Sequence, residues 1–492
     1  MSKFEELGPS PSPSPSLMKL SAPIIKQAPV VVNRVMKTGF QRMLGHSNQK
    51  AYWDISTELT IKALDVIVNE TKPESLHTIQ SLTLKDFGVT GKIWVSKAIL
   101  PPPPEDSIRQ VLFKAIENLK WPGDAPGGYD HPEIAHVEGE WTGYRSNANL
   151  LSRELKISER EKYEAMMQEV TSTATIMYIH GGAHFLLDPA FYRTMTQKLA
   201  KNTGGRCFSV RYRLAPQNPF PAPLLDVFLA YVSLLYPPPG SFHAPVPSSE
   251  IVFAGDSAGG NLSYALLQLI LELQRSSLKI IWYGEERVVP VPGGMACLSP
   301  WLDITLSMPS NVTNRQFDFL PKRELQFKSS GVWPSNPPRK FMYANDTLVS
   351  HPLVSPVTVT DWRGSCPIYV AVGWELLADE NKFTIMQMAN QGVTIVYEEY
   401  EAMPHCFGLL LPKAASFGKF HQSWAQNIKK IVNRPYEMKT SGTLIRARSL
   451  KCEELNIYNL SPLTHREIIK FIEDKARDEP IKRTSSDIKN CR

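Results

Sequence analysis

Residues 251–262 read IVFAGDSAGGNL, and they constrain the fold of this chain more than any other stretch. An apolar run ends in the motif GDSAG at 255–259, and apolar residues then recur at helical spacing. This pattern predicts a buried strand, a sharp turn carrying Ser257, and a helix. Small residues two positions either side of Ser257 let strand and helix approach closely, and the strained turn raises the hydroxyl above the sheet. The turn alone is also typical of ordinary glycine-rich connections, so its meaning depends on its context.

Short apolar runs alternate with helical segments through much of the chain. Expected strands occupy residues 136–144, 174–179, 206–210, 251–256, 294–298, 368–372 and 394–397. Expected helices occupy residues 191–201, 224–235 and 257–275. Strands that alternate with helices of this length predict the α/β class, with a mostly parallel sheet covered on both faces and an antiparallel edge at 136–144.

Composition divides the chain into four regions, at 1–29, 30–136, 137–435 and 436–492. The first is Pro/Ser-rich and is expected to build no core. The second has helical periodicity and is expected to pack as a helical cap region over a larger domain. The third holds the predicted α/β fold, interrupted at 310–350 by a stretch that is long for a plain connection and suits a substrate-covering insertion.

The fourth region, 436–492, is basic and polar, and we expect a solvated tail in which residues 463–475 could form one amphipathic helix. No apolar stretch is long enough to span a bilayer, because the longest, 222–236, is interrupted by Asp226. The first residues lack the apolar core of a secretory signal. We therefore expect a cytoplasmic, reducing location.

Charge and cysteine content narrow the function classes. The formal net charge of +6 is small for 492 residues and gives no case for a nucleic-acid partner. The six cysteines show no metal-binding spacing, and several lie in apolar runs, so buried free thiols are expected. They are Cys207, Cys297, Cys366, Cys406, Cys452 and Cys491.

A glycine pair follows the predicted strand 174–179. A serine that attacks a carbonyl creates an oxyanion, which needs preorganised N–H donors worth about 3 kcal/mol each. The backbone N–H groups of Gly181 and Gly182, with that of Ala258 after the serine, are the candidate oxyanion-hole donors. The alternative is a simple glycine turn at the start of a helix.

Two more groups complete the chemistry that Ser257 would need. His405 lies in a loop after the last predicted strand, so the candidates occur in the order nucleophile, acid, histidine. The acid must orient the imidazole and stabilise its charged form. Glu375 lies just beyond a strand end and is preferred, whereas Asp379 would fall in the following helix and stays an alternative.

Together these motifs resemble the hormone-sensitive-lipase branch of the α/β-hydrolase superfamily, which includes arylacetamide deacetylases and many carboxylesterases. The resemblance spans residues 137–432 and implies that Ser257 is the nucleophile, His405 the base and Glu375 the acid. In this family the acid is usually Asp, and Ala183 stands where a third glycine is usual. The matching motifs are HGG at 180–182, YRLAP at 212–216, FPA at 220–222 with Asp226, GDSAGGNL at 255–262, SPWLD at 299–303, and the loops of Glu375 and His405.

The resemblance implies a serine esterase that needs no metal or organic cofactor. Its substrate is expected to be a small apolar acyl or aryl ester, given the aromatic residues Trp53, Phe317, Phe319, Trp333 and Phe341 in the cap segments. Three alternatives stay open: an amidase or deacetylase with the same machinery, a binding protein without catalysis, and a lipase-like protein that contacts lipid surfaces weakly. Nothing in the sequence indicates the oligomeric state.

Overall fold

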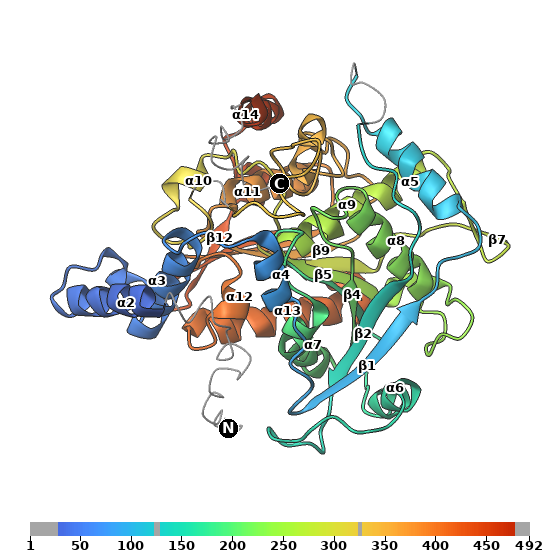
Figure 1. Ribbon diagram of the computed structural model, residues 1–492, viewed down its shortest axis with the longest axis horizontal. Helices are drawn as coiled ribbons and strands as arrows, with labels where there is room; N and C mark the ends of the chain where they lie inside the picture. The colour runs from blue at the N-terminus through green and yellow to red at the C-terminus, as the bar shows by residue number, and fades with distance from the viewer. Residues whose placement is uncertain (1–27, 123–127, 323–326, 478–492) are drawn as a thin grey trace.

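The computed structural model describes residues 28–122, 128–322 and 327–477 (Figure 1). Most of the expected Pro/Ser-rich region and the end of the expected tail, at 478–492, lie outside the described residues. The described chain is organised around one large twisted sheet with helices on both faces, as the alternation of strand and helix patterns predicted.

Ten strands form the main sheet in the order β1-β2-β4-β3-β5-β8-β9-β10-β11-β12. All strands from β4 across to β11 run parallel, whereas β1, β2 and β12 are antiparallel at the two edges. The strands are β1 (Ile93–Leu100), β2 (Val137–Tyr144), β3 (Thr175–Ile179), β4 (Arg206–Arg211), β5 (Ile251–Asp256), β8 (Gly294–Leu298), β9 (Ile368–Gly373), β10 (Ile395–Tyr400), β11 (Ser441–Ile445) and β12 (Cys452–Leu455). A separate hairpin joins β6 (Ile280–Trp282) to β7 (Glu285–Arg287).

Helices cover both faces of the sheet (Figure 1). One core includes the apolar side chains of α5, α8, α9 and α11, and a second core those of α7 and α13. Because both faces are covered, the central strands β3, β5, β8 and β9 are buried along their whole length. The helices are α2 (Ala28–Met43), α3 (Ile55–Asn69), α4 (Leu76–Thr83), α5 (Ser107–Asn118), α6 (Glu159–Met167), α7 (Pro189–Thr203), α8 (Ala222–Leu235), α9 (Ser257–Arg275), α10 (Ser310–Thr313), α11 (Ala378–Asn390), α12 (Phe407–Leu410), α13 (Ala415–Asn433) and α14 (His465–Arg477).

The region expected as a helical cap is divided between two parts of the molecule. Its residues 93–100 form β1, which pairs antiparallel with β2 and takes the edge position predicted for 136–144. Helix α5 packs with α8 and α9 in the main core, where Ile108 and Leu112 are fully buried. Among the described residues, α2, α3, α4 and the 3-10 helix Asn48–Ala51 precede β1, so the sheet begins earlier in the chain than residue 137.

The described part of the expected basic tail, residues 436–477, forms strands and helices. Strand β11 continues the parallel sheet beside β10, β12 pairs with it, and α14 contacts a short 3-10 helix, Pro356–Thr358. Ile468 and Ile472 of α14 are fully buried. The amphipathic pattern at 463–475 therefore marks a helix that packs on the domain, whereas the basic composition suggested a solvated tail.

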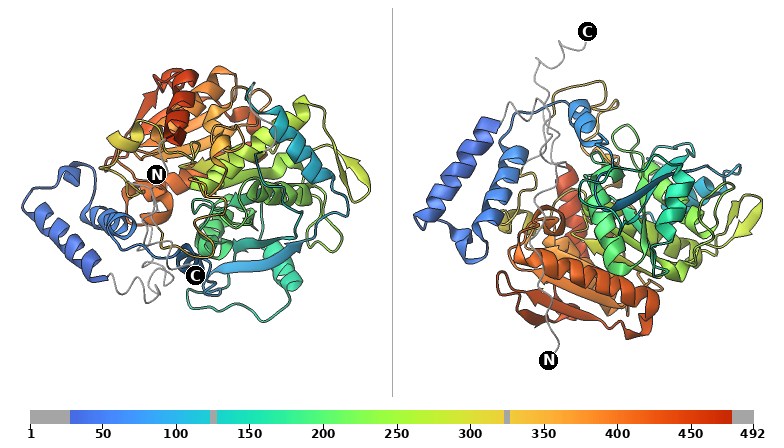
Figure 2. Two further views of the ribbon diagram at one scale, coloured as in Figure 1. Left: turned by 45° about the horizontal axis from the view of Figure 1, so that its top comes forward. Right: turned by 90° about the horizontal axis from the view of Figure 1, so that it is seen from below.

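The first two helices form a hairpin that stands out from the sheet (Figure 2). It is attached to distant parts of the chain. The Trp53 indole donates to the Ala402 carbonyl at 2.7 Å, shortly before His405. Lys322, in the 310–350 insertion, pairs with Asp65 of α3 at 2.6 Å. The hairpin therefore lies against both the insertion and the loop that carries His405.

Five cysteines fall in the described residues, and all are unpaired, as expected. Four of them are buried, and Cys452 is exposed. Within the same residues, no helix combines the length and apolar character needed to cross a bilayer.

The packing of α14 predicts a measurable stability effect. Ile472→Ala should lower the free energy of unfolding by about 2–5 kcal/mol, because it leaves a cavity under the helix. Lys470→Ala on the exposed face of the same helix is the matched control and should change it by about 0.5 kcal/mol or less. Urea unfolding followed by tryptophan fluorescence measures both. Equal stability of the two variants would show that α14 does not pack in solution.

Candidate active site

Ser257 lies at the junction of β5 and α9, in the strained turn that the sequence predicted. Its φ is +52°, in the left-handed region, and its side chain is partly exposed. A Cβ at Gly259 would lie 1.9 Å from the Ile179 carbonyl oxygen of β3, so only glycine fits there. The turn therefore needs its small residues to hold the serine at the carboxyl end of β5.

His405 and Glu375 meet at the carboxyl ends of β10 and β9. The Nδ1 atom of His405 lies 3.2 Å from Oε1 of Glu375, and both side chains are buried. Asp379, the alternative acid, starts α11 and instead accepts a hydrogen bond from the Ser310 N–H at 2.7 Å. The structure thus brings Glu375 to the histidine and leaves Asp379 in the first turn of a helix.

Ser299 joins these groups, and the sequence analysis gave it no role beyond a place in a matching motif. It is fully buried at the end of β8, with φ +49°. Its hydroxyl donates to Oε2 of Glu375 at 2.5 Å and accepts from the Cys406 N–H at 3.2 Å. Its carbonyl accepts from the Ser257 N–H at 3.2 Å. Strands β5, β8, β9 and β10 are consecutive neighbours, so Ser257, Ser299, Glu375 and His405 follow four adjacent strands.

Asp318 is a second residue that the sequence did not single out. It lies in the 310–350 insertion and is buried. One oxygen accepts from the His405 N–H at 3.2 Å, and the other accepts from the Leu376 N–H at 2.8 Å. Asp318 therefore holds the backbone of the loop of His405 and the backbone of the loop of Glu375. In the described chain it makes no hydrogen bond to the side chain of either residue.

The charges around His405 favour its protonated form. Burial lowers the pKa of His405, but the Glu375 carboxylate, with Asp318 and Asp256, outweighs that effect and raises the pKa above its ordinary value. Burial also raises the pKa of Glu375, and this effect outweighs the hydrogen bonds from His405 and Ser299, which lower it. Burial likewise raises the pKa of Asp256, and this effect outweighs the hydrogen bond from Tyr178, which lowers it.

The predicted oxyanion donors divide into engaged and free groups. The Gly181 N–H donates to Oδ1 of Asp256 at 3.3 Å. Among the described residues, the N–H groups of Gly182, Ala183 and Ala258 find no acceptor. Gly182 has φ +107°, and a Cβ there would meet the Leu186 carbonyl oxygen at 2.2 Å, so the loop requires glycine at this position.

The Ser257 hydroxyl makes no hydrogen bond within the part of the chain that the structure describes. Ser299 bonds the backbone N–H of Ser257 on one side and that of Cys406, the residue after His405, on the other. No group of three or more His, Cys, Asp or Glu residues in the described ranges is arranged to hold a metal ion.

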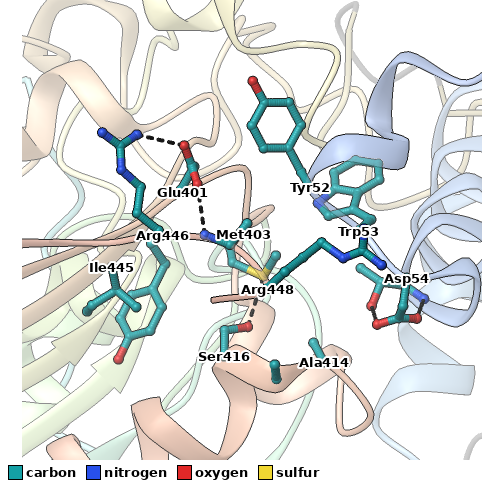
Figure 3. A pocket seen from close by; sticks show the side chains of 14 residues that line it. Tyr52, Trp53, Asp54, Glu401, Met403, Ala414, Ser416, Ile445, Arg446 and Arg448 are labelled. Carbon is teal, nitrogen blue, oxygen red and sulfur yellow. Dashed lines mark hydrogen bonds and ion pairs between the residues drawn. The ribbon is translucent and has the colours of Figure 1, made fainter. Parts of the chain in front are cut away.

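A cavity of about 180 Å³ lies behind the His405 loop, between the N-terminal hairpin and β11 (Figure 3). Its lining includes Tyr52, Met403, Ser416 and Arg448 but neither Ser257 nor Glu375. The Ser416 hydroxyl donates to the Met403 sulfur at 3.0 Å, and Arg448 reaches across the opening toward the hairpin (Figure 3). This cavity is separate from the serine turn.

Comparison with known proteins agrees with the fold described above. A family profile described as alpha/beta hydrolase fold matches residues 176–409, which include Ser257, Glu375 and His405. Residues 176–409 therefore match the α/β-hydrolase fold, within a sheet that extends beyond them on both sides. An acetyl-hydrolase from Streptomyces hygroscopicus is 28% identical over 233 residues, 47% of this chain and 67% of that protein. The hormone-sensitive lipase of Bos taurus is 31% identical over 277 residues, 55% of this chain and 31% of that protein.

A solved structure extends the agreement in fold beyond the profile. A crystal structure of an esterase from the bacterial hormone-sensitive lipase (HSL) family superposes with a TM-score of 0.51 and 21% identity. It covers 77% of this chain and 99% of that one. The predicted fold class is therefore confirmed. The sequence similarity to the acetyl-hydrolase and to the hormone-sensitive lipase confirms the resemblance that the motifs indicated.

The two acids of the hydrolase domain make different predictions. Glu375→Gln should lower kcat by about a thousandfold or more, because the amide no longer stabilises a charged His405. Asp379→Asn, four residues further along in the first turn of α11, should lower kcat by about tenfold or less, since in the described chain the Asp379 carboxylate bonds only the Ser310 N–H. Steady-state kinetics with p-nitrophenyl butyrate compare them, and a larger loss in the Asp379 variant would reverse the assignment.

The charge of Asp318 near His405 predicts how kcat/KM depends on pH. His405 must be neutral to act as a base, so kcat/KM should fall as pH drops through its raised pKa, above about 6.5. Asp318→Asn removes one of the charges that raise this pKa, so the midpoint of the acid limb should move to lower pH. Asp346→Asn is the control, because the Asp346 carboxylate lies in the same insertion and bonds the backbone N–H groups of residues 340 and 341. An unmoved midpoint in Asp318→Asn would contradict the electrostatic role.

Proposed function

We propose that this chain is a serine hydrolase that cleaves carboxylic esters. One observation carries the proposal: the carboxyl ends of four adjacent strands bear Ser257, Ser299, Glu375 and His405, with Glu375 3.2 Å from the histidine. A nucleophile on a strained turn, an imidazole and a carboxylate that orients it are the groups that acyl transfer through a serine requires. The names of the relatives support ester hydrolysis.

In this mechanism Ser257 attacks the acyl carbonyl while His405 takes the hydroxyl proton through Nε2. Glu375 holds the ring by its contact with Nδ1 and stabilises the imidazolium that forms. His405 then gives the proton to the leaving alcohol, which departs and leaves an acyl ester on Ser257. Water, activated by the same histidine, hydrolyses that ester and restores the serine.

The oxyanion is held by backbone N–H groups around the turn. We assign Gly182 and Ala258, as the sequence suggested, because both N–H groups have no acceptor in the described chain. The Gly181 N–H is engaged by Asp256, so the free N–H of Ala183 takes the place expected of Gly181. Each donor stabilises the developing negative charge only when substrate is present.

The contact between Ser257 and His405 belongs to the substrate-bound enzyme. Hydrogen bonds of this kind are often long or misaligned without substrate and tighten in the reacting complex. Ser299 bonds the Ser257 N–H and the N–H of Cys406, the residue after His405, so one residue anchors both the serine turn and the histidine loop. The mechanism requires the Ser257 side chain to meet His405 when substrate is bound.

The substrate side of the site is apolar. Next to the oxyanion loop, the buried side chains of Leu76 and Phe185 contact the partly buried Phe327 and Trp333 of the insertion. The rings of Phe185 and Phe327 meet edge to face at 5.9 Å. Such walls favour a small apolar acyl or aryl ester.

Two of the five aromatic residues expected at the substrate have other contacts. Trp53 and Phe317 are buried and pack edge to face, which joins the N-terminal hairpin to the insertion. Phe319 is also buried, and its ring lies beside that of His405, with the ring centroids 6.5 Å apart. Trp333, close to the oxyanion loop, is the stronger candidate for substrate contact.

The decisive variant is Ser257→Ala. It should reduce hydrolysis of p-nitrophenyl butyrate by at least about a thousandfold and abolish labelling by a fluorophosphonate probe, while the circular dichroism spectrum stays unchanged. Ser81→Ala, an exposed serine on α4, is the matched control and should keep both. Wild-type turnover by Ser257→Ala would overturn the proposal. Matched ester and amide substrates, tested on the wild type, separate esterase from amidase preference.

A further inference from the structure

Helix α2 carries an unusual apolar surface. None of its residues is buried, and the large apolar side chains on its outer face are between about half and three quarters exposed. These are Val32 (53%), Met36 (68%), Phe40 (59%), Met43 (76%) and, just after the helix, Leu44 (55%). Single exposed apolar residues are ordinary, but a contiguous stripe marks a surface that contacts something.

The spacing shows that these residues form one face. Positions 32, 36, 40, 43 and 44 recur every three to four residues, so their side chains project from the same side of α2. The adjoining side of the helix packs on α3, where a Cβ at Gly39 would lie 3.8 Å from Leu59. Figures 1 and 2 show α2 at the outer edge of the molecule, with α3 between it and the sheet. We call the residues of the preceding list the α2 stripe.

The sequence around α2 contains basic residues and no acidic ones. From residue 7 to residue 53 the sequence contains no Asp or Glu, although it contains six basic residues. Arg34 and Arg42 pair with Glu70 and Glu58, but in the described chain Lys37, beside the stripe, has no acidic partner. The six basic residues are Lys19, Lys26, Arg34, Lys37, Arg42 and Lys50.

We propose that the α2 stripe docks this protein on an anionic lipid surface, with the helix lying in the plane of the interface. An exposed apolar face bordered by basic residues is the pattern of interfacial helices. Lys37, beside the stripe, matches anionic headgroups, because a basic side chain near such a surface is attracted to it. A second copy of this chain fits less well, because pairing two α2 stripes would bring two basic segments together.

This inference goes beyond the proposed ester hydrolysis, since the stripe contains no residue of the catalytic site. The hairpin nevertheless connects the two. Trp53 bonds the Ala402 carbonyl near His405, and α3 bonds the insertion that carries Asp318 through Asn69 and the Phe319 carbonyl at 3.1 Å. Docking through α2 therefore holds the hydrolase domain at the lipid surface by way of the elements that border its site.

Vesicle flotation of the full chain tests the proposal. Wild-type protein should float with vesicles of phosphatidylcholine containing about 30% phosphatidylserine and stay in solution with phosphatidylcholine alone, and ~0.5 M NaCl should weaken the binding. Met36→Ser/Phe40→Ser should reduce the bound fraction by about tenfold or more, because both side chains lose their apolar contact with lipid. Hydrolysis of soluble p-nitrophenyl butyrate should be unchanged in this variant, which separates the test from that of the esterase proposal.

A matched control replaces exposed apolar residues elsewhere. Leu150→Ser/Leu151→Ser changes side chains that are 73% and 89% exposed on a distant loop and should leave vesicle binding unchanged. Full-length protein that stays in solution with both kinds of vesicle overturns the proposal, as does equal binding by wild type and the α2 variant. Equal binding to neutral and anionic vesicles overturns the proposal that the surface must be anionic. A wild-type dimer by light scattering that becomes monomeric in the α2 variant assigns the stripe to a second copy instead.

Discussion

The hydrogen bond from Ser299 to Glu375, 2.5 Å long, is the interaction on which the proposed catalytic arrangement depends. A fully buried carboxylate is costly unless its oxygens are bonded, and here one oxygen faces His405 while the other accepts from Ser299. Because Ser299 also bonds the backbone of Ser257 and Cys406, the residue that bonds the proposed acid also fixes the spacing between the Ser257 turn and the His405 loop.

Much of this site could be predicted because it lies at strand ends. Side chains that follow neighbouring parallel strands converge at one edge of the sheet, so the order of Ser257, Glu375 and His405 in the chain was informative about their positions. The preference for Glu375 over Asp379 followed from the same reasoning, since a residue just beyond a strand faces the edge, whereas the next helix leads away from it. The contact with His405 agrees with that preference.

Other features left little signal in the sequence. Ser299 and Asp318 act through backbone N–H groups, and a serine or aspartate in a polar stretch is too common to identify such a role. Strand β1 lies in a region of mostly helical periodicity, and its place depends on pairing with β2, which a local pattern does not reveal. The short strands β11 and β12 are only partly apolar, because they complete an edge rather than a centre, and basic composition concealed them.

The bond between Trp53 and the Ala402 carbonyl joins residues 349 positions apart in the chain. Contacts of such long range are slow to form, because the chain between them must first be closed. During synthesis the N-terminal hairpin leaves the ribosome long before the strands that it will contact. Its attachment is therefore a late event in biogenesis, and until it occurs the nascent chain exposes both surfaces of that contact to chaperones and to other chains.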